Sequence, residues 1–202
     1  MNDLYLLAAK IIQLIIAVSF HEVAHGYVAY REGDPTAKLS GRLTLNPLKH
    51  LDPFLSIIFP LSLFVLGSPV VFGAAKPVPV NPYAFKRGRR SEVRVAAAGI
   101  LTNLGLALSN AICLRFFPGL GVFFETGIII NTVLFVFNAL PVPPLDGSRI
   151  IYVFMPYSIK KLFIELEKYS FLLIFVLLYF FGDLIFGLVY PLVKIFYLIA
   201  YF

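Results

Sequence analysis

Long apolar runs are the feature that most limits what this chain can fold into. They occupy residues 4–20, 54–75, 95–117, 122–140 and 171–202. A helix needs about 20 apolar residues to cross the hydrocarbon core of a bilayer. Within that core every backbone amide and carbonyl must find a partner in the protein, and a helix supplies those partners within its own segment. The pattern therefore predicts an all-α polytopic membrane protein.

The composition agrees with a membrane protein and argues against nucleic-acid binding. Hydrophobic residues make up 59% of the 202 residues, and charged residues only 14%. The formal net charge is +6, but the basic side chains lie between the apolar runs, without interleaved aromatic residues on which bases could stack. They suit membrane topology and contact with the lipid bilayer instead. The one cysteine, Cys113, cannot form a disulfide within the chain.

The sequence HEVAH places two histidines and a glutamate inside an apolar run, where ionisable groups are costly. In a helix, His21 and His25 lie one turn apart, and Glu22 can point into the same site. Imidazole nitrogens bind Zn²⁺, and a glutamate beside them can take a proton from a zinc-bound water. A polar seam that only joins helices would need fewer such groups, so this spacing favours a zinc site.

A catalytic zinc site needs a third protein ligand and an open position for water. Asp146 is a candidate, because it follows Pro141, Pro143 and Pro144, which end the apolar run before it. An aspartate at the membrane end of a broken helix can supply a carboxylate oxygen. The alternative is a loop aspartate that forms a turn with Gly147.

Several motifs together resemble the site-2 protease family of intramembrane zinc metalloproteases, in particular its short prokaryotic subgroup without a PDZ domain. HEVAH is similar to the zinc-helix motif of that family, NALPVPPLDG to its N-x-x-P-x-x-P-x-D-G motif, and AAAGILTNLGLAL to its G-x-x-x-N helix. NPLKHLDP and GAAKPVPVNP resemble segments of the short subgroup. The chain departs from the family pattern at Ile100, where proline is usual, and at Ser148, where glycine is frequent.

The resemblance implies that His21, His25 and Asp146 hold zinc and that Glu22 activates the attacking water. The implied function is that of an intramembrane zinc metalloendopeptidase, whose partner is a membrane protein substrate with a transmembrane segment. The alternative is a non-proteolytic membrane zinc-binding or transport protein. Such a protein would need further metal sites along a pathway, and the sequence offers few other intramembrane carboxylates apart from Asp183.

Two asparagines are candidates for substrate contacts. Asn138 lies in the NALPVPPLDG motif and is a candidate catalytic residue, and Asn103 lies in the G-x-x-x-N helix. Either amide could donate a hydrogen bond to the substrate carbonyl or to the oxyanion that develops on it. The alternative for both is a contact between helices, which transmembrane asparagines commonly make.

A shared zinc site also constrains the topology. If residues 54–75 crossed the membrane, the helix that carries HEVAH and the helix before Asp146 would end at opposite leaflets. We therefore expect a re-entrant segment at 54–75, bent around Pro60 and residues 67–69. Residues 31–95 then carry ten Lys and Arg on one side, and residues 146–170 carry four more. The positive-inside rule makes that side of the cell membrane cytoplasmic, with the active site toward it.

The expected organisation is one integral-membrane domain over residues 1–202. It comprises the zinc helix at 4–30, a re-entrant and extended region with short strands at 31–90, and core helices at 91–117 and 122–141. A helical hairpin at 169–202 follows, because Gly182, Asp183 and Pro191 interrupt the last apolar run.

Two further segments are candidates for substrate handling. In KPVPVNP the alternating prolines exclude a helix and leave an extended segment, whose residues Val78 and Val80 could bind an unwound substrate strand. A rigid proline linker is an equal alternative. In NPLKHLDP, His50 and Asp52 could gate water entry, cap the re-entrant segment or visit the metal. Because three zinc ligands are already assigned, we expect His50 to have a gating or structural role.

Overall fold

The computed structural model describes residues 2–50 and 76–202, and this part of the chain is helical, without a strand. Within these described ranges, four helices are long and apolar enough to cross a membrane. They are α1 (Asn2–Arg31), α4 (Arg89–Phe116), α5 (Gly121–Ala139) and α8 (Ser170–Tyr201). The all-α prediction is confirmed, and the chain has the helices of a multi-pass membrane protein.

Shorter elements connect the long helices. They are α2 (Thr36–Leu39), the 3-10 turns η1 (Pro47–Lys49), η3 (Pro82–Ala84) and η4 (Pro118–Leu120), α6 (Asp146–Tyr152) and α7 (Tyr157–Glu167). The short strands expected within residues 31–90 are not found in the described part of that region, and residues 76–80 have no regular secondary structure. The expected re-entrant segment, 54–75, lies outside the described residues.

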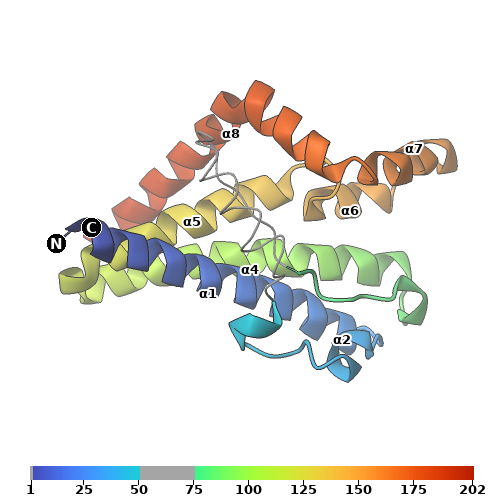
Figure 1. The fold of residues 1–202 in the computed structure, drawn as a ribbon, viewed down its shortest axis with the longest axis horizontal. Coiled ribbons are helices and arrows are strands. Elements are labelled where there is room, and N and C mark those ends of the chain that lie inside the picture. Colours follow the sequence, from blue (N-terminus) through green and yellow to red (C-terminus); the bar gives the residue numbers. More distant parts are fainter. Residues whose placement is uncertain (1, 51–75) are drawn as a thin grey trace.

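The long helices alternate in direction, so that α1 and α5 run one way and α4 and α8 the other (Figure 1). The end of α1 lies beside the start of α4, because Glu32 accepts hydrogen bonds from Ser91 Oγ and Arg94 Nη1, each at 2.7 Å. Helix α5 ends at the same end of the bundle, where α6 and α7 follow it (Figure 1). This arrangement brings the end of α1 and the start of α6 to one side of the molecule, which is a condition for a shared site.

Small residues allow the helices to pack closely. Ala17 and Ala29 on α1 and Ala107 and Ala111 on α4 are fully buried. Lipid tails are as apolar as leucine, so helices in a membrane associate mainly through close packing, which small side chains permit. Many large apolar side chains, such as Phe180 on α8, are instead exposed on the outside of the bundle, as expected for a lipid-facing surface.

The expected C-terminal hairpin is wrong, because α8 is one continuous helix from Ser170 to Tyr201. Figure 1 shows a bend within it. Pro191 lacks the N–H that would bond to the carbonyl of Gly187, and such a missing bond is a common cause of helix bending. In lipid a full break would leave backbone groups without partners, so the chain bends but stays helical.

Candidate metal centre

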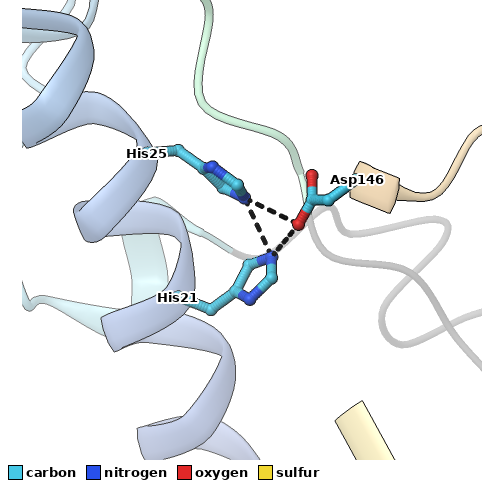
Figure 2. Close-up of side chains that lie close together, drawn as sticks. All are labelled: His21, His25 and Asp146. Carbon is cyan, nitrogen blue, oxygen red and sulfur yellow. Dashed lines mark hydrogen bonds and ion pairs between the residues drawn. The ribbon is translucent and has the colours of Figure 1, made fainter. Parts of the chain in front are cut away.

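Three side chains expected to bind metal meet in the structure. His21 and His25 lie one turn apart on α1, and Asp146 is the first residue of α6. Figure 2 shows the three side chains pointing toward one another. The two Nε2 atoms are 3.0 Å apart, and Asp146 Oδ2 lies 3.3 Å from His21 Nε2 and 3.1 Å from His25 Nε2. The group has the composition and spacing to hold a metal ion.

The size of this triangle fits zinc. Ligand atoms that lie 2.0–2.1 Å from a tetrahedral zinc ion are about 3.3 Å from one another. The three observed separations lie between 3.0 and 3.3 Å. The triangle therefore approximates one face of a zinc tetrahedron, and the described residues supply three ligands for it.

The protonation of the histidines also fits a cation. His25 Nδ1 lies 2.7 Å from the Val95 carbonyl, which can only accept, so Nδ1 carries a hydrogen, and in the neutral imidazole Nε2 keeps its lone pair. His21 Nδ1 lies 2.7 Å from Asn103 Oδ1, which leaves Nε2 of His21 facing the centre in the same way. Two lone pairs and a carboxylate oxygen then face one another, and this arrangement is repulsive unless a cation lies between them.

The carboxylate of Asp146 is ionised in this environment. Burial alone would raise the pKa of Asp146, but when His21 and His25 carry protons on the facing nitrogens in place of a metal cation, their contacts outweigh burial and lower the pKa to about 2. Oδ2 of Asp146 has no other hydrogen-bond partner in the described part of the chain. An ionised, otherwise unpartnered carboxylate oxygen is a suitable ligand for a zinc ion.

Two glycines make room for this group and were missed as site residues. A Cβ added to Gly99 on α4 would overlap the rings of both His21 and His25. A Cβ added to Gly147 would overlap the carbonyls at the end of α5, so only glycine lets α6 start there and aim Asp146 inward. Gly99 was visible in the sequence as the first residue of the G-x-x-x-N motif, one turn before Asn103.

Glu22 lies beside the two histidines and is held by the proline-rich segment. Its Oε2 accepts a hydrogen bond from the Val78 amide at 2.8 Å. Pro77 and Pro79 flank Val78 and have no N–H, so Val78 is the one backbone donor of this three-residue stretch. The Val78 side chain is buried close to Gly26 of α1. The segment therefore lies along the site and contacts the residue expected to act as the base.

Further contacts fix the proline-rich segment at its start. The Lys76 amide donates to the His50 carbonyl at 2.9 Å, and Arg42 Nη2 donates to the Lys76 carbonyl at 2.7 Å. His50 is buried, and its Nε2 lies 2.6 Å from the Thr44 carbonyl. His50 is not part of the metal-binding group formed by the described residues, and its gating role stays a prediction.

The two candidate asparagines lie in different surroundings. Asn103 is fully buried behind His21, and its Nδ2 donates to Asn131 Oδ1 at 3.1 Å, so its amide is already engaged on both sides. This geometry favours an orienting role over the expected contact with substrate. Asn138 is half-buried near the end of α5, and its Nδ2 donates to the Leu134 carbonyl at 3.0 Å. Val80, the other expected substrate-contact residue, is half-buried.

Comparisons with known proteins agree with the site. The chain is 44% identical to "Putative zinc metalloprotease YwhC" of Bacillus subtilis over 186 residues, which cover 86% of this chain and 81% of that protein. It is 30% identical to "Putative zinc metalloprotease Rip2" of Mycolicibacterium smegmatis, over 81% of this chain and 64% of the relative. A shorter match, 38% identical over 90 residues, covers 41% of this chain and 46% of "Putative zinc metalloprotease MJ0611" of Methanocaldococcus jannaschii.

No family model matches the chain, and no solved structure matches it. The identity to YwhC nevertheless extends over most of both proteins. On this ground the chain belongs to the site-2 protease family of zinc metalloproteases.

Proposed function

We propose that this protein is an intramembrane zinc metalloendopeptidase, which hydrolyses a peptide bond in or near a transmembrane segment of another membrane protein. The observation that carries the proposal is the distance of the metal-binding group from the end of a helix that can span the membrane. His21 lies within a helix suited to span the membrane, ten residues before its end at Arg31, which is about 15 Å along the helix. A peptide bond that reaches this group must come from a segment within or close to the bilayer.

The proposed zinc ligands are His21, His25 and Asp146. When bound there, zinc would polarise the scissile carbonyl and lower the pKa of a coordinated water to about 7. The family membership and the three converging acceptor atoms support this assignment. Helix α1 and the start of α6 hold the three acceptor atoms in fixed positions.

Glu22 is the proposed general base. It takes a proton from the attacking water and later gives a proton to the departing amine. The hydrogen bond from the Val78 amide supports this role, because it holds Oε2, while Oε1 has no hydrogen bond to another described residue and can accept a proton. Asn138 is a proposed donor to the substrate carbonyl, since its bond to Leu134 engages one of the two N–H groups of its amide and the other has no partner among the described residues.

The proline-rich segment, residues 76–80, is the proposed edge along which an unwound substrate lies. Val78 contributes through its buried position beside Glu22. The Val80 amide is the proposed donor to the substrate backbone, because it has no hydrogen bond to another described residue. Replacing Val80 with proline removes that donor, so we propose that this change slows cleavage while zinc content is kept.

We further propose that the site faces the cytoplasmic side of the cell membrane. The end of α1, the start of α4 and the segment after α5 lie at one end of the bundle, and they carry most of the basic residues (Figure 1). An excess of lysine and arginine at the ends of spanning helices marks the cytoplasmic side.

A single comparison tests the proposed function. Wild type, Glu22→Gln and the control Glu125→Gln are reconstituted in vesicles with a single-span substrate, and cleavage products are identified by mass spectrometry. Glu125 makes a suitable control because it bonds to the Tyr201 hydroxyl instead of the site. We expect Glu22→Gln to keep zinc and lose cleavage, while the control keeps both. Normal cleavage by Glu22→Gln, or equal cleavage of the same peptide sequence in a soluble protein, would contradict the proposal.

A further inference from the structure

A chain of hydrogen bonds runs from His21 into the buried centre of the bundle. His21 Nδ1 lies 2.7 Å from Asn103 Oδ1 on α4, and Asn103 Nδ2 donates to Asn131 Oδ1 on α5 at 3.1 Å. Asn131 Nδ2 donates in turn to the Gly127 carbonyl at 2.9 Å. Both asparagine side chains are fully buried, so their partners are protein groups.

The last acceptor fixes the direction of every bond in this chain. A backbone carbonyl can only accept, so Asn131 turns its NH₂ toward Gly127 and its oxygen toward Asn103. Asn103 must then donate with its NH₂ and present its oxygen to His21. His21 donates through Nδ1–H as a result, and in the neutral ring its Nε2 keeps the lone pair that faces His25 and Asp146.

Resting on the proposed role of His21 as a zinc ligand, we propose that Asn131 is a positioning residue of the metal centre. It acts through Asn103, whose amide it orients, and thereby fixes the tautomer and the ring orientation of His21. For His25, the Val95 carbonyl fixes the tautomer and the ring orientation directly. Loss of such supporting hydrogen bonds typically weakens metal binding about 10- to 100-fold.

The structure provides a matched control on the same helix. Asn110 lies two turns after Asn103 on α4 and is also buried. It accepts from Gln13 Nε2 at 2.9 Å and donates to the Leu106 carbonyl at 2.8 Å, without a hydrogen bond to the metal-binding group. A residue that contributes only to helix packing should behave like Asn110.

The experiment uses the full chain, purified in detergent, as wild type, Asn131→Leu, Asn131→Asp and Asn110→Leu. Zinc affinity is measured by competition with a chelator, the ligand field by the visible spectrum after Co²⁺ substitution, and stability by thermal unfolding of the metal-free protein. Leucine removes the acceptor for Asn103, so we expect zinc binding about tenfold weaker and an altered Co²⁺ spectrum. Aspartate still accepts from Asn103, so its zinc affinity should stay close to that of wild type, without the loss of about 10- to 100-fold that removal of a supporting hydrogen bond causes.

Stability should follow a different order, which separates positioning from packing. A carboxylate within the bundle is costly, so Asn131→Asp should unfold at a lower temperature than Asn131→Leu although it binds zinc more tightly. Asn110→Leu should lose stability and keep the zinc affinity of wild type. Zinc affinities that follow the order of stability, or equal losses in the Asn131→Leu and Asn110→Leu variants, would overturn the inference.

A His21→Ala variant separates this inference from the function on which it rests. If His21→Ala keeps the zinc affinity of wild type, the proposed zinc site is wrong. If His21→Ala loses zinc while Asn131→Leu keeps wild-type affinity, only the positioning role of Asn131 is wrong.

Discussion

Two buried polar networks join α1, α4 and α5, and they differ in how they end. In the first, Gln13 donates to Asn110 Oδ1 and to the Phe123 carbonyl, and Asn110 donates back to its own helix. In the second, the chain of hydrogen bonds from Asn131 through Asn103 to His21 ends at acceptor atoms that face one another. The first network closes on itself and can only hold helices together. The second ends in lone pairs and therefore makes a site for a cation.

Each network needs a glycine on a facing helix. A Cβ at Gly127 would overlap Asn110 and crowd Gln13, and a Cβ at Gly99 would overlap His21 and His25. Close helix approach thus serves both networks, and packing alone does not distinguish them. The difference lies in whether each acceptor has a donor, so variants of the two networks should affect different measured quantities.

The largest expected effect follows from removing one converging acceptor. Asp146→Ala should abolish cleavage and weaken zinc binding. Loss of a supporting hydrogen bond typically weakens metal binding about 10- to 100-fold, and loss of a ligand should weaken it further. Asp183→Ala is the control, because Asp183 is exposed on α8 and belongs to neither network. Zinc content and initial cleavage rate are measured for both variants. Full zinc occupancy with normal turnover in Asp146→Ala would remove this residue from the ligand set.

A smaller effect is expected when the space around the rings is filled. Gly99→Ala should weaken zinc binding at least about tenfold, because the new methyl group displaces both imidazoles from their supporting hydrogen bonds. The matched control is Gly105→Ala on the same helix, where an added Cβ meets no atom of a described residue within 4 Å. The control should keep zinc affinity and gain stability, by about 0.5–1 kcal/mol. Similar zinc affinities in the two variants would refute the steric role of Gly99.

The closed network should respond only in stability. Gln13→Leu removes a buried interhelical hydrogen bond, and we expect a loss of about 1 kcal/mol in the free energy of unfolding. Zinc affinity should be unchanged, since Gln13 makes no contact with the metal-binding group. Chelator competition and reversible unfolding in detergent test the two quantities separately. A change in zinc affinity would show that the two networks are coupled through α1.

The smallest effect concerns a carboxylate outside both networks, where α1 meets α4. Hydrogen bonds from Ser91 and Arg94 hold the pKa of Glu32 below its ordinary value of 4.5. The ionised form therefore stabilises the folded state above about pH 4.5, and this stabilisation is lost as the pH falls through the lowered pKa. Wild type should unfold at a slightly higher temperature than Glu32→Gln at pH 7, and the difference should shrink on acidification. A difference that grows at low pH would contradict this assignment.

Local sequence patterns predicted much of the fold. The apolar runs placed three spanning helices to within about two residues, since expected ranges 4–30, 91–117 and 122–141 became Asn2–Arg31, Arg89–Phe116 and Gly121–Ala139. The spacing of His21 and His25 is a property of one helix, so it could be recognised without the fold. The assignment of Asp146 to the same site could not rest on one helix. Asp146 reaches the histidines because α1 and α5 end at the same end of the bundle.

Other features depend on tertiary contacts and could not be predicted from local patterns. Whether Pro191 breaks or bends the last helix depends on the packing around it, and its neighbours Val189 and Phe196 are buried against the other long helices. The pairing of Asn103 with Asn131 joins residues 28 positions apart on two helices, and no spacing rule encodes it. The role of Asn103 behind His21 was therefore hidden until the helices were placed together.

The most direct test of the central claim is X-ray absorption at the zinc edge on purified wild-type protein, with the metal content measured on the same sample. The account predicts a single zinc per chain, with two imidazole nitrogens and oxygen ligands at about 2.0–2.1 Å. Protein that retains cleavage activity without zinc, or a zinc signal with fewer than two imidazoles, would contradict the account.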